Sequence, residues 1–335
     1  MKTRIITFIV ISIIILLVCV GLLVLHSHSK QNILLSQGRI AVQGEINPDE
    51  AGIFMYSGYF NVLWRISPTD MLAFSPAWSP DGKRIAFVYS DLNRTAFHIA
   101  VIDVNDRKME SIDDKAIGGL SIQQDTSIAW SPDGNSLLFD ATSEDGCFYT
   151  FLYNFTDKLS RKVDIAPFCQ SAAGDTVYKM DISWFPGEQP LIGVSYFAGY
   201  NNLDDIYLLN NTLTKLSWVV HGSFPIWRPT TEDFSYICWE KGSGYPPSIC
   251  LFSTRNNLST KLVDINYADQ YSWSPDGQSI LFVETQGESD PVYLSLINLE
   301  TGENYRLLKL VNYNWVYVFP FPYRWVNGKA IWSSR

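Results

Sequence analysis

Residues 78–82 read Trp-Ser-Pro-Asp-Gly, and the same five residues recur at 130–134 and at 273–277. Weaker copies, each beginning with a tryptophan, lie at 184–187, 227–229 and 325–328. Neighbouring copies begin 43 to 54 residues apart. A repeat of about 40–50 residues built from short strands is typical of a β-propeller rather than of a helical solenoid.

One repeat contains four stretches with strand character, at 77–79, 84–88, 97–103 and 108–112. The Pro-Asp-Gly segment suits a tight turn between the first two stretches. Proline presets φ, aspartate accepts local backbone hydrogen bonds, and glycine adopts the left-handed conformation. Four antiparallel strands make one blade, so the sequence predicts an all-β propeller of four-stranded blades.

The tryptophans and the turns beside them are explained most simply by architecture. A flat indole fills the space between two blades, and a turn of this composition needs no ligand. A ring of binding carboxylates is the alternative, but a turn position suits a catalytic group poorly. The residues given this structural role are Trp78, Asp81, Gly82, Trp130, Asp133, Gly134, Trp273, Asp276 and Gly277.

The Trp-Ser-Pro-Asp-Gly turn followed by an Ile-x-Phe strand resembles the TolB-type, WD40-like propeller repeat. With the strands between copies, the resemblance covers about residues 38–335. It implies a propeller that is most often six-bladed and frequently extracytoplasmic. It also implies a platform for binding proteins or ligands, with no shared catalytic motif to carry over.

The two ends of the repeat region are expected to share one blade. Residues 38–42, 52–56 and 62–66 resemble the second, third and fourth strands of a blade, whereas 323–325 and 330–332 resemble a first and a second strand. Five full blades and this composite give six. Because a second strand is then present twice, seven blades remain the alternative.

The N-terminus is predicted to anchor the chain in a membrane. Lys2 and Arg4 precede an apolar stretch at residues 5–25, which is long enough to span a bilayer as a helix. Positive charges in front favour a cytoplasmic N-terminus and an exported remainder. A cleaved signal peptide is the alternative. We therefore divide the chain into a stub, transmembrane anchor and start of a tether at 1–30, and a propeller at 31–335.

Cysteine usage is consistent with export. Outside the apolar N-terminal stretch the chain has four cysteines, an even number that permits two disulfides. We expect Cys238 to pair with Cys250 and Cys147 to pair with Cys169; four buried free thiols are the alternative. No pair has the close spacing of a zinc site, and we expect no metal and no cofactor.

Composition narrows the range of partners. The net charge is −9 and no basic stripe is present, so nucleic acid is not an expected partner. The chain lacks the Gly-x-Ser-x-Gly elbow, a phosphate loop and a dinucleotide fingerprint. His98 is interpreted as a core residue of a strand, and the carboxylate pairs Asp113-Asp114 and Asp204-Asp205 as solvated loop charges.

These observations favour a non-catalytic, extracytoplasmic propeller that binds a protein or a glycan at the membrane surface. The alternative is a carbohydrate-active propeller enzyme, a hydrolase or lyase, with carboxylates or His221 at the mouth of the channel.

Overall fold

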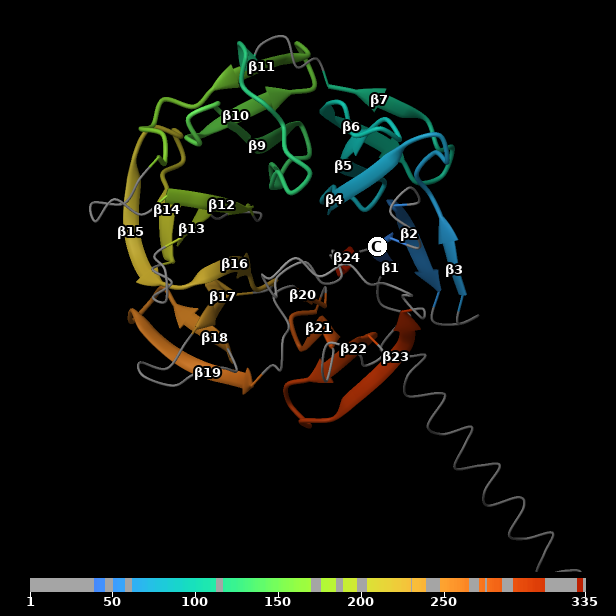
Figure 1. The fold of residues 1–335 in the computed structure, drawn as a ribbon. Coiled ribbons are helices and arrows are strands. Elements are labelled where there is room, and N and C mark those ends of the chain that lie inside the picture. Colours follow the sequence, from blue (N-terminus) through green and yellow to red (C-terminus); the bar gives the residue numbers. More distant parts are fainter. Residues whose placement is uncertain are drawn as a thin grey trace, which may run out of the picture.

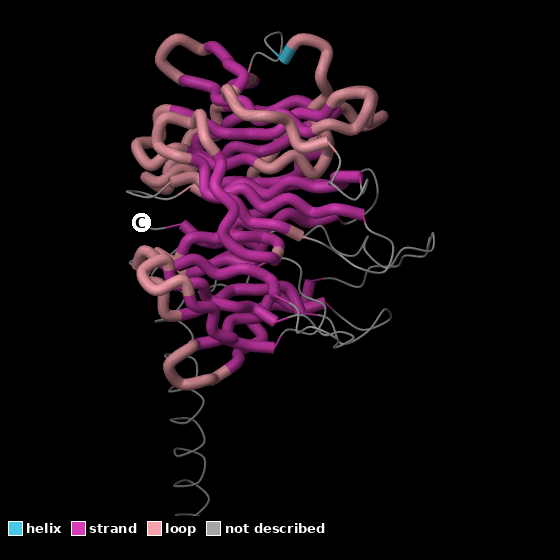
Figure 2. Tube along the Cα trace, turned by 90° about the vertical axis from the view of Figure 1, so that its left-hand side faces the viewer, coloured by secondary structure: helices cyan, strands magenta, loops and turns pink. Residues whose placement is uncertain are grey.

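The strands form six four-stranded sheets within the described residues, and every neighbouring pair is antiparallel. The computed structural model describes residues 39–45, 51–57, 62–112, 117–169, 176–184, 189–197, 204–229, 231–238, 248–264, 271–274, 276–284, 292–310 and 330–333. Strands make up most of the described part of the chain (Figure 2). The all-β propeller of four-stranded blades is thus confirmed.

Five sheets each use four consecutive strands. The first contains β4 (Leu72–Trp78), β5 (Arg84–Ser90), β6 (Phe97–Asp103) and β7 (Met109–Ser111). The second contains β8 (Ile128–Trp130), β9 (Ser136–Thr142), β10 (Phe148–Asn154) and β11 (Leu159–Lys162). The third contains β12 (Thr176–Ser183), β13 (Leu191–Phe197), β14 (Asp205–Leu209) and β15 (Leu216–His221).

The fourth contains β16 (Ser223–Trp227), β17 (Asp233–Cys238), β18 (Ser248–Ser253) and β19 (Leu258–Asp264). The fifth contains β20 (Tyr271–Trp273), β21 (Ser279–Glu284), β22 (Val292–Asn298) and β23 (Asn304–Leu310). Figure 1 shows the sheets around a common centre, with β12, β16 and β20 on the inside and β15, β19 and β23 on the outside.

The remaining sheet joins the two ends of the chain. Its order is β24-β1-β2-β3, with β1 at Arg39–Glu45, β2 at Ala51–Ser57, β3 at Val62–Arg65 and β24 at Ala330–Ser333. The prediction that 330–332 is a second strand is wrong: β1 pairs with β2 along one edge, and β24 takes its other edge, the first-strand position. The predicted strand at 323–325 lies outside the described residues.

The apolar core lies between neighbouring sheets rather than inside any one of them. Phe74 and Val88 of one sheet pack with Phe139 and Tyr153 of the next, and all four are buried. Similar buried clusters join each successive pair of sheets from the composite one to the sheet of β20–β23. Burial of this kind is the main source of cohesion between sheets that share no backbone ladder.

Each complete Trp-Ser-Pro-Asp-Gly copy forms the same hydrogen-bonded turn. In the first, Ser79 Oγ donates to Asp81 Oδ1 over 2.6 Å and accepts from the backbone N–H of Arg84 over 2.9 Å. The glycine N–H donates to the carbonyl of Ser79, and its φ of 65° is left-handed. The copies at 131–136 and 274–279 repeat these contacts. The contacts account for the serine, aspartate and glycine of the motif without a ligand.

Two of the three tryptophans in the complete copies, Trp130 and Trp273, also bond to the preceding sheet, whereas Trp78 Nε1 is buried without a hydrogen-bond partner among the described residues. Trp130 Nε1 donates to the carbonyl of Ala77 over 2.9 Å, and Trp273 Nε1 donates to Ser235 Oγ over 2.8 Å. An arginine from the preceding sheet covers the indole of each. Arg84 lies 4.6 Å from the Trp130 ring and donates to the carbonyl of Gly134 over 2.8 Å.

The second such arginine is Arg228, 5.1 Å from the Trp273 ring, which donates to the carbonyl of Gly277 over 2.9 Å. In both junctions, one arginine therefore binds the tryptophan face and the turn of the next sheet together.

The predicted anchor at residues 5–25 lies outside the described residues. Among the residues that the structure describes, no helix combines the length and the apolar character needed to cross a bilayer.

The arginine contact yields a stability prediction. Replacing Arg84 by methionine keeps an apolar stem but removes the cation–π contact and the hydrogen bond to Gly134. We expect the free energy of unfolding to fall by about 1–3 kcal/mol. Chemical denaturation measures it. Arg161→Met is the control, because Arg161 forms an exposed ion pair with Asp157 that is worth less than about 1 kcal/mol. Equal losses in the two variants would contradict the role given to Arg84.

Candidate functional site

The four cysteines outside the N-terminal stretch lie in two bonded pairs. Cys147 is joined to Cys169, and Cys238 is joined to Cys250. The first bond ties the start of β10 to the segment after β11, where Phe168 forms an isolated bridge with Phe148. The second links the neighbouring strands β17 and β18.

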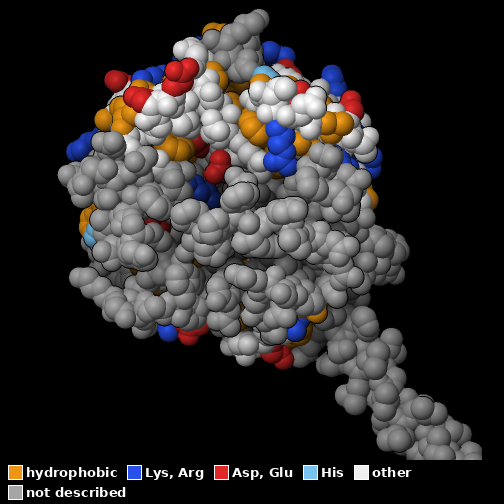
Figure 3. All heavy atoms as spheres, viewed as in Figure 1, with side chains coloured by type: hydrophobic (Ala, Val, Ile, Leu, Met, Phe, Trp, Pro, Cys, Tyr) orange, Lys and Arg blue, Asp and Glu red, His pale blue; other side chains and the backbone are white. Residues whose placement is uncertain are grey.

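Charged side chains gather at the middle of the ring. Figure 3 shows acidic and basic side chains in a hollow there, near the inner strand β12. That strand carries Lys179 and Asp181, whose Nζ and Oδ1 atoms are 3.8 Å apart, and both side chains are largely buried. Lys179 Nζ also lies 4.1 Å from the ring of Phe224 on the next sheet.

A buried carboxyl group lies behind this pair. Asp140 on β9 is 2% exposed and accepts from the backbone N–H of Ser127 over 2.6 Å. Ser127 Oγ in turn accepts from the backbone N–H of Ile182 over 2.8 Å. Asp140 therefore holds the segment before β8, which holds β12 of the next sheet.

Burial raises the pKa of Asp140 well above its ordinary value of 3.8. The hydrogen bond from Ser127 opposes this change, whereas the negative charges of Asp125 and Asp181 raise the pKa further. A carboxyl group in such surroundings favours its neutral form.

A tyrosine closes the other side of the cluster. Tyr271 on β20 is buried, and its hydroxyl donates to the carbonyl of Phe224 over 3.0 Å. Burial raises the pKa of Tyr271, and the charge of Asp181 adds to the effect. The cluster thus joins four sheets and offers one ammonium group, one partly exposed carboxylate and an aromatic ring for binding.

Two inner strands bend at equivalent places. Ser75 of β4 and Phe224 of β16 both have left-handed φ angles, of 47° and 51°, and each precedes a proline. Each lies at a shift in strand register. Such bulges redirect side chains and are frequent beside functional sites. The bulge in β16 places Phe224 against Lys179.

Two interpretations of single residues are wrong. Asp204 is 3% exposed, so it is not a solvated loop charge, and Asp205 belongs to β14. His221 does not lie at the channel mouth, because it ends β15, the outer strand of its sheet. His98 is half-buried on β6 with its ring 5.4 Å from that of Tyr89. Asp113-Asp114 lies outside the described residues.

Within the described part of the chain, no group of three or more His, Cys, Asp and Glu side chains is arranged to hold a metal ion.

Comparison with solved structures supports the fold. The TolB protein of Acinetobacter baumannii has a TM-score of 0.62 and 16% identity, covering 89% of this chain and 67% of its own. A second structure described as TolB, from Agrobacterium tumefaciens, has a TM-score of 0.55 and 16% identity, covering 81% and 89%. An oligogalacturonate lyase with manganese also has a TM-score of 0.55, at 11% identity, covering 83% and 81%.

No family model matches the chain, and no curated protein matches it in sequence. At these identities the structural likeness establishes a propeller fold, which TolB proteins share with enzymes.

Asp140 yields a prediction with a definite sign. Its pKa is raised by folding, so the folded state binds more protons, and its contribution to stability falls as pH rises from about 4 through the folded pKa. Asp140→Asn keeps an oxygen for Ser127 and removes this charge. We expect the stability of the variant, relative to the original chain, to improve as pH rises from 4 to 8 in denaturation experiments.

Asp133→Asn serves as the opposite control. Hydrogen bonds from Ser131 and Asn135 lower the pKa of Asp133. The stability that Asp133 contributes is present above about pH 4 and is lost as pH falls through its folded pKa. The Asp133→Asn variant should therefore be less stable than the original chain at neutral pH. If the stabilities of the two variants changed with pH in the same way, the role given to the buried Asp140 carboxyl would be contradicted.

Proposed function

We propose that this chain is a non-catalytic binding module whose ring recognises a protein or a glycan through the charged cluster at its centre. The observation that supports it most is the Lys179–Asp181 pair beside Phe224, which combines charge, hydrogen-bonding groups and an aromatic face at the junction of two inner strands. Partly desolvated charges of this kind give specificity and orientation to recognition.

In this proposal, the composite sheet β24-β1-β2-β3 acts as the sixth blade and closes the ring. Pairing of the two chain ends in one sheet would then resist opening of the propeller. A closed ring keeps β12 and β16 in fixed positions relative to each other, which the central cluster requires.

We also propose that the apolar stretch at 5–25 anchors the chain, with the ring on the extracytoplasmic side. The basic residues before the stretch and its length support this arrangement. The two disulfides suit an oxidising compartment.

The enzyme alternative is less well supported. One of the groups on which it relies, His221, lies on an outer strand, and Asp140 is enclosed by Ser127 and the neighbouring strands.

If ligands bind at the centre of the ring, substitution of Lys179 should weaken their capture. The full-length chain, solubilised in detergent, is used to capture partners from membrane and envelope extracts and from a polysaccharide panel. We expect Lys179→Gln to weaken capture tenfold or more, which corresponds to about 1.4 kcal/mol. Lys179→Arg keeps the charge and should retain part of the binding.

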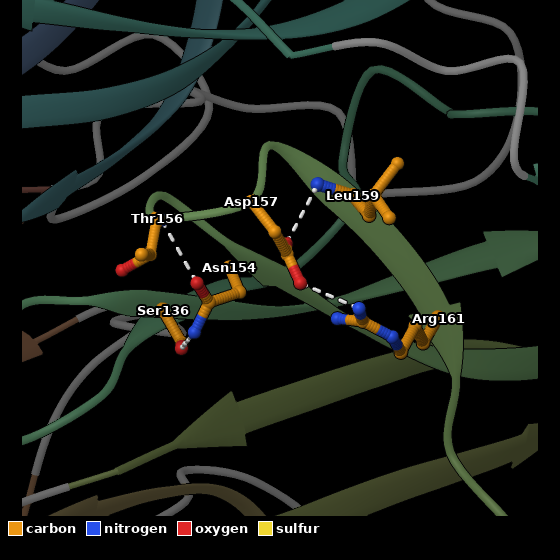
Figure 4. A network of polar contacts seen from close by, with 6 residues as sticks. All are labelled: Ser136, Asn154, Thr156, Asp157, Leu159 and Arg161. Atoms are coloured by element: carbon orange, nitrogen blue, oxygen red, sulfur yellow. Dashed lines mark hydrogen bonds and ion pairs between the residues drawn. The ribbon is translucent and has the colours of Figure 1, made fainter.

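Lys158→Gln is the matched control. Lys158 is exposed and forms an ion pair with Glu110. It lies on the turn between β10 and β11, and Figure 4 shows polar contacts of this turn. Its variant should bind like the original chain. Unchanged capture by a folded Lys179→Gln variant, or cleavage of a polysaccharide in the panel, would contradict the proposed function.

The anchor is tested by fractionation. The chain should stay with the membrane after an alkaline carbonate wash, because about 20 apolar residues bind a bilayer essentially irreversibly. Deletion of residues 1–25 should release it into the soluble fraction. Release of the intact chain by carbonate would show that the segment is no integral anchor.

A further inference from the structure

Away from the centre, an exposed tryptophan and an exposed histidine share one carboxylate. Trp218 Nε1 donates to Asp205 Oδ1 over 2.9 Å, and His221 Nδ1 lies 2.8 Å from the same oxygen. The two rings are 5.1 Å apart at an interplanar angle of 65°. Trp218 is 53% exposed, and the His221 side chain is 73% exposed.

A β-bulge brings these residues to one face of the sheet. Residues 218 and 221 would point to opposite faces of a regular strand. In β15, His221 pairs with Asp205 and Trp218 pairs with Tyr207, so the register shifts at Val219. Since Asp205 and Tyr207 are two residues apart on β14, all four side chains share a face.

The neighbouring sheet supports this face from below. The ring of Phe168 lies 5.5 Å from that of Tyr207. Phe168 is held by its bridge with Phe148 and precedes Cys169, which is bonded to Cys147. The aromatic group therefore rests on a covalently fixed segment, and the cost of ordering it on binding is small.

Two groups remain available to a ligand, the face of the Trp218 indole and Nε2 of His221. The only polar group of Trp218 is bound to Asp205, so the indole offers solvent its flat, electron-rich face. A carboxylate partner makes His221 Nδ1 the donor, which leaves Nε2 to accept in the neutral ring or to donate in the protonated one. A hydroxyl group satisfies either state, because it both donates and accepts.

We propose that Trp218, His221 and Asp205 form a lateral glycan site that takes one pyranose ring. The weakly positive C–H face of the sugar stacks on Trp218, a hydroxyl group bonds to His221 Nε2, and Asp205 positions both. The site lies on the outer strand β15 and its neighbour β14, apart from the inner strand β12 that carries Lys179 (Figure 1).

The surroundings favour a sugar over a protein partner. Hot spots for proteins lie in well-packed patches from which water is excluded. Here β15 follows a polar turn in which Asn210, Thr212 and Thr214 bond to one another, and the two threonines are exposed. An aromatic platform this exposed suits a ligand that keeps much of its own hydration.

This inference rests on the proposed binding function and names a ligand class for a second place on the ring. The test applies the full-length chain, in a detergent without a sugar head group, to an array of gluco-, galacto-, manno- and N-acetylglucosamine oligosaccharides. One part of the array carries free polysaccharide fragments and another carries protein-linked glycans, which separates these two sources of pyranose.

We expect the chain to bind at least one member, Trp218→Ala to weaken that binding at least tenfold, and Trp218→Phe to weaken it less. His221→Gln should weaken it several-fold. Trp64→Ala is the control, because Trp64 is also exposed on an outer strand, β3. It should bind like the original chain, and thermal melting should show all four variants folded.

No binding to any member would overturn the lateral site, as would equal binding by the Trp218→Ala and Trp64→Ala variants. If Lys179→Gln lost glycan binding and Trp218→Ala kept it, the sugar would bind at the centre of the ring and the lateral site would be overturned. If only Trp218→Ala lost glycan binding, the lateral site would be supported even where the proposed binding through Lys179 fails.

Discussion

The contact between neighbouring sheets is the constraint on which the rest of the molecule depends. All the backbone ladders of the described strands run within sheets, so cohesion between sheets relies on side chains. Buried apolar clusters supply most of it. Trp130 and Trp273 also restrict the rotation of one blade against another, because each indole N–H bonds to the preceding sheet. The Arg84 and Arg228 contacts extend this link to the turn of the next sheet.

This constraint explains why the fold was predictable. A tryptophan, a serine, an aspartate and a glycine at fixed spacing each satisfy a separate local requirement, and together they mark the first hairpin of a blade. The predicted strands at 84–88 and 97–103 correspond to β5 and β6. The strand order of the composite sheet β24-β1-β2-β3 was not predictable in the same way. An apolar segment such as 330–332 shows that a strand forms, whereas its position depends on which edge is free.

The candidate sites were less accessible to sequence reasoning. The Trp218, His221 and Asp205 group depends on one extra residue in β15, and a register shift leaves no clear composition signal. Asp140 is similar: an acidic residue in the apolar strand 136–142 is visible, but its burial, its bond to Ser127 and the bond from Ser127 to Ile182 of the next sheet depend on packing. In both places the deciding contacts depend on strand register or on packing, which the strand pattern alone does not give.

The position of a tryptophan relative to the repeat helps to separate structural from functional roles. Trp130, Trp227 and Trp273 begin repeat copies, are almost completely buried, and donate to neighbouring segments. Trp218 begins no copy, and more than half of its surface is exposed. An exposed indole that is nevertheless held by a hydrogen bond adds little to blade packing. Because its orientation is fixed and its face is open, ligand recognition is the better account of its place on the outer strand.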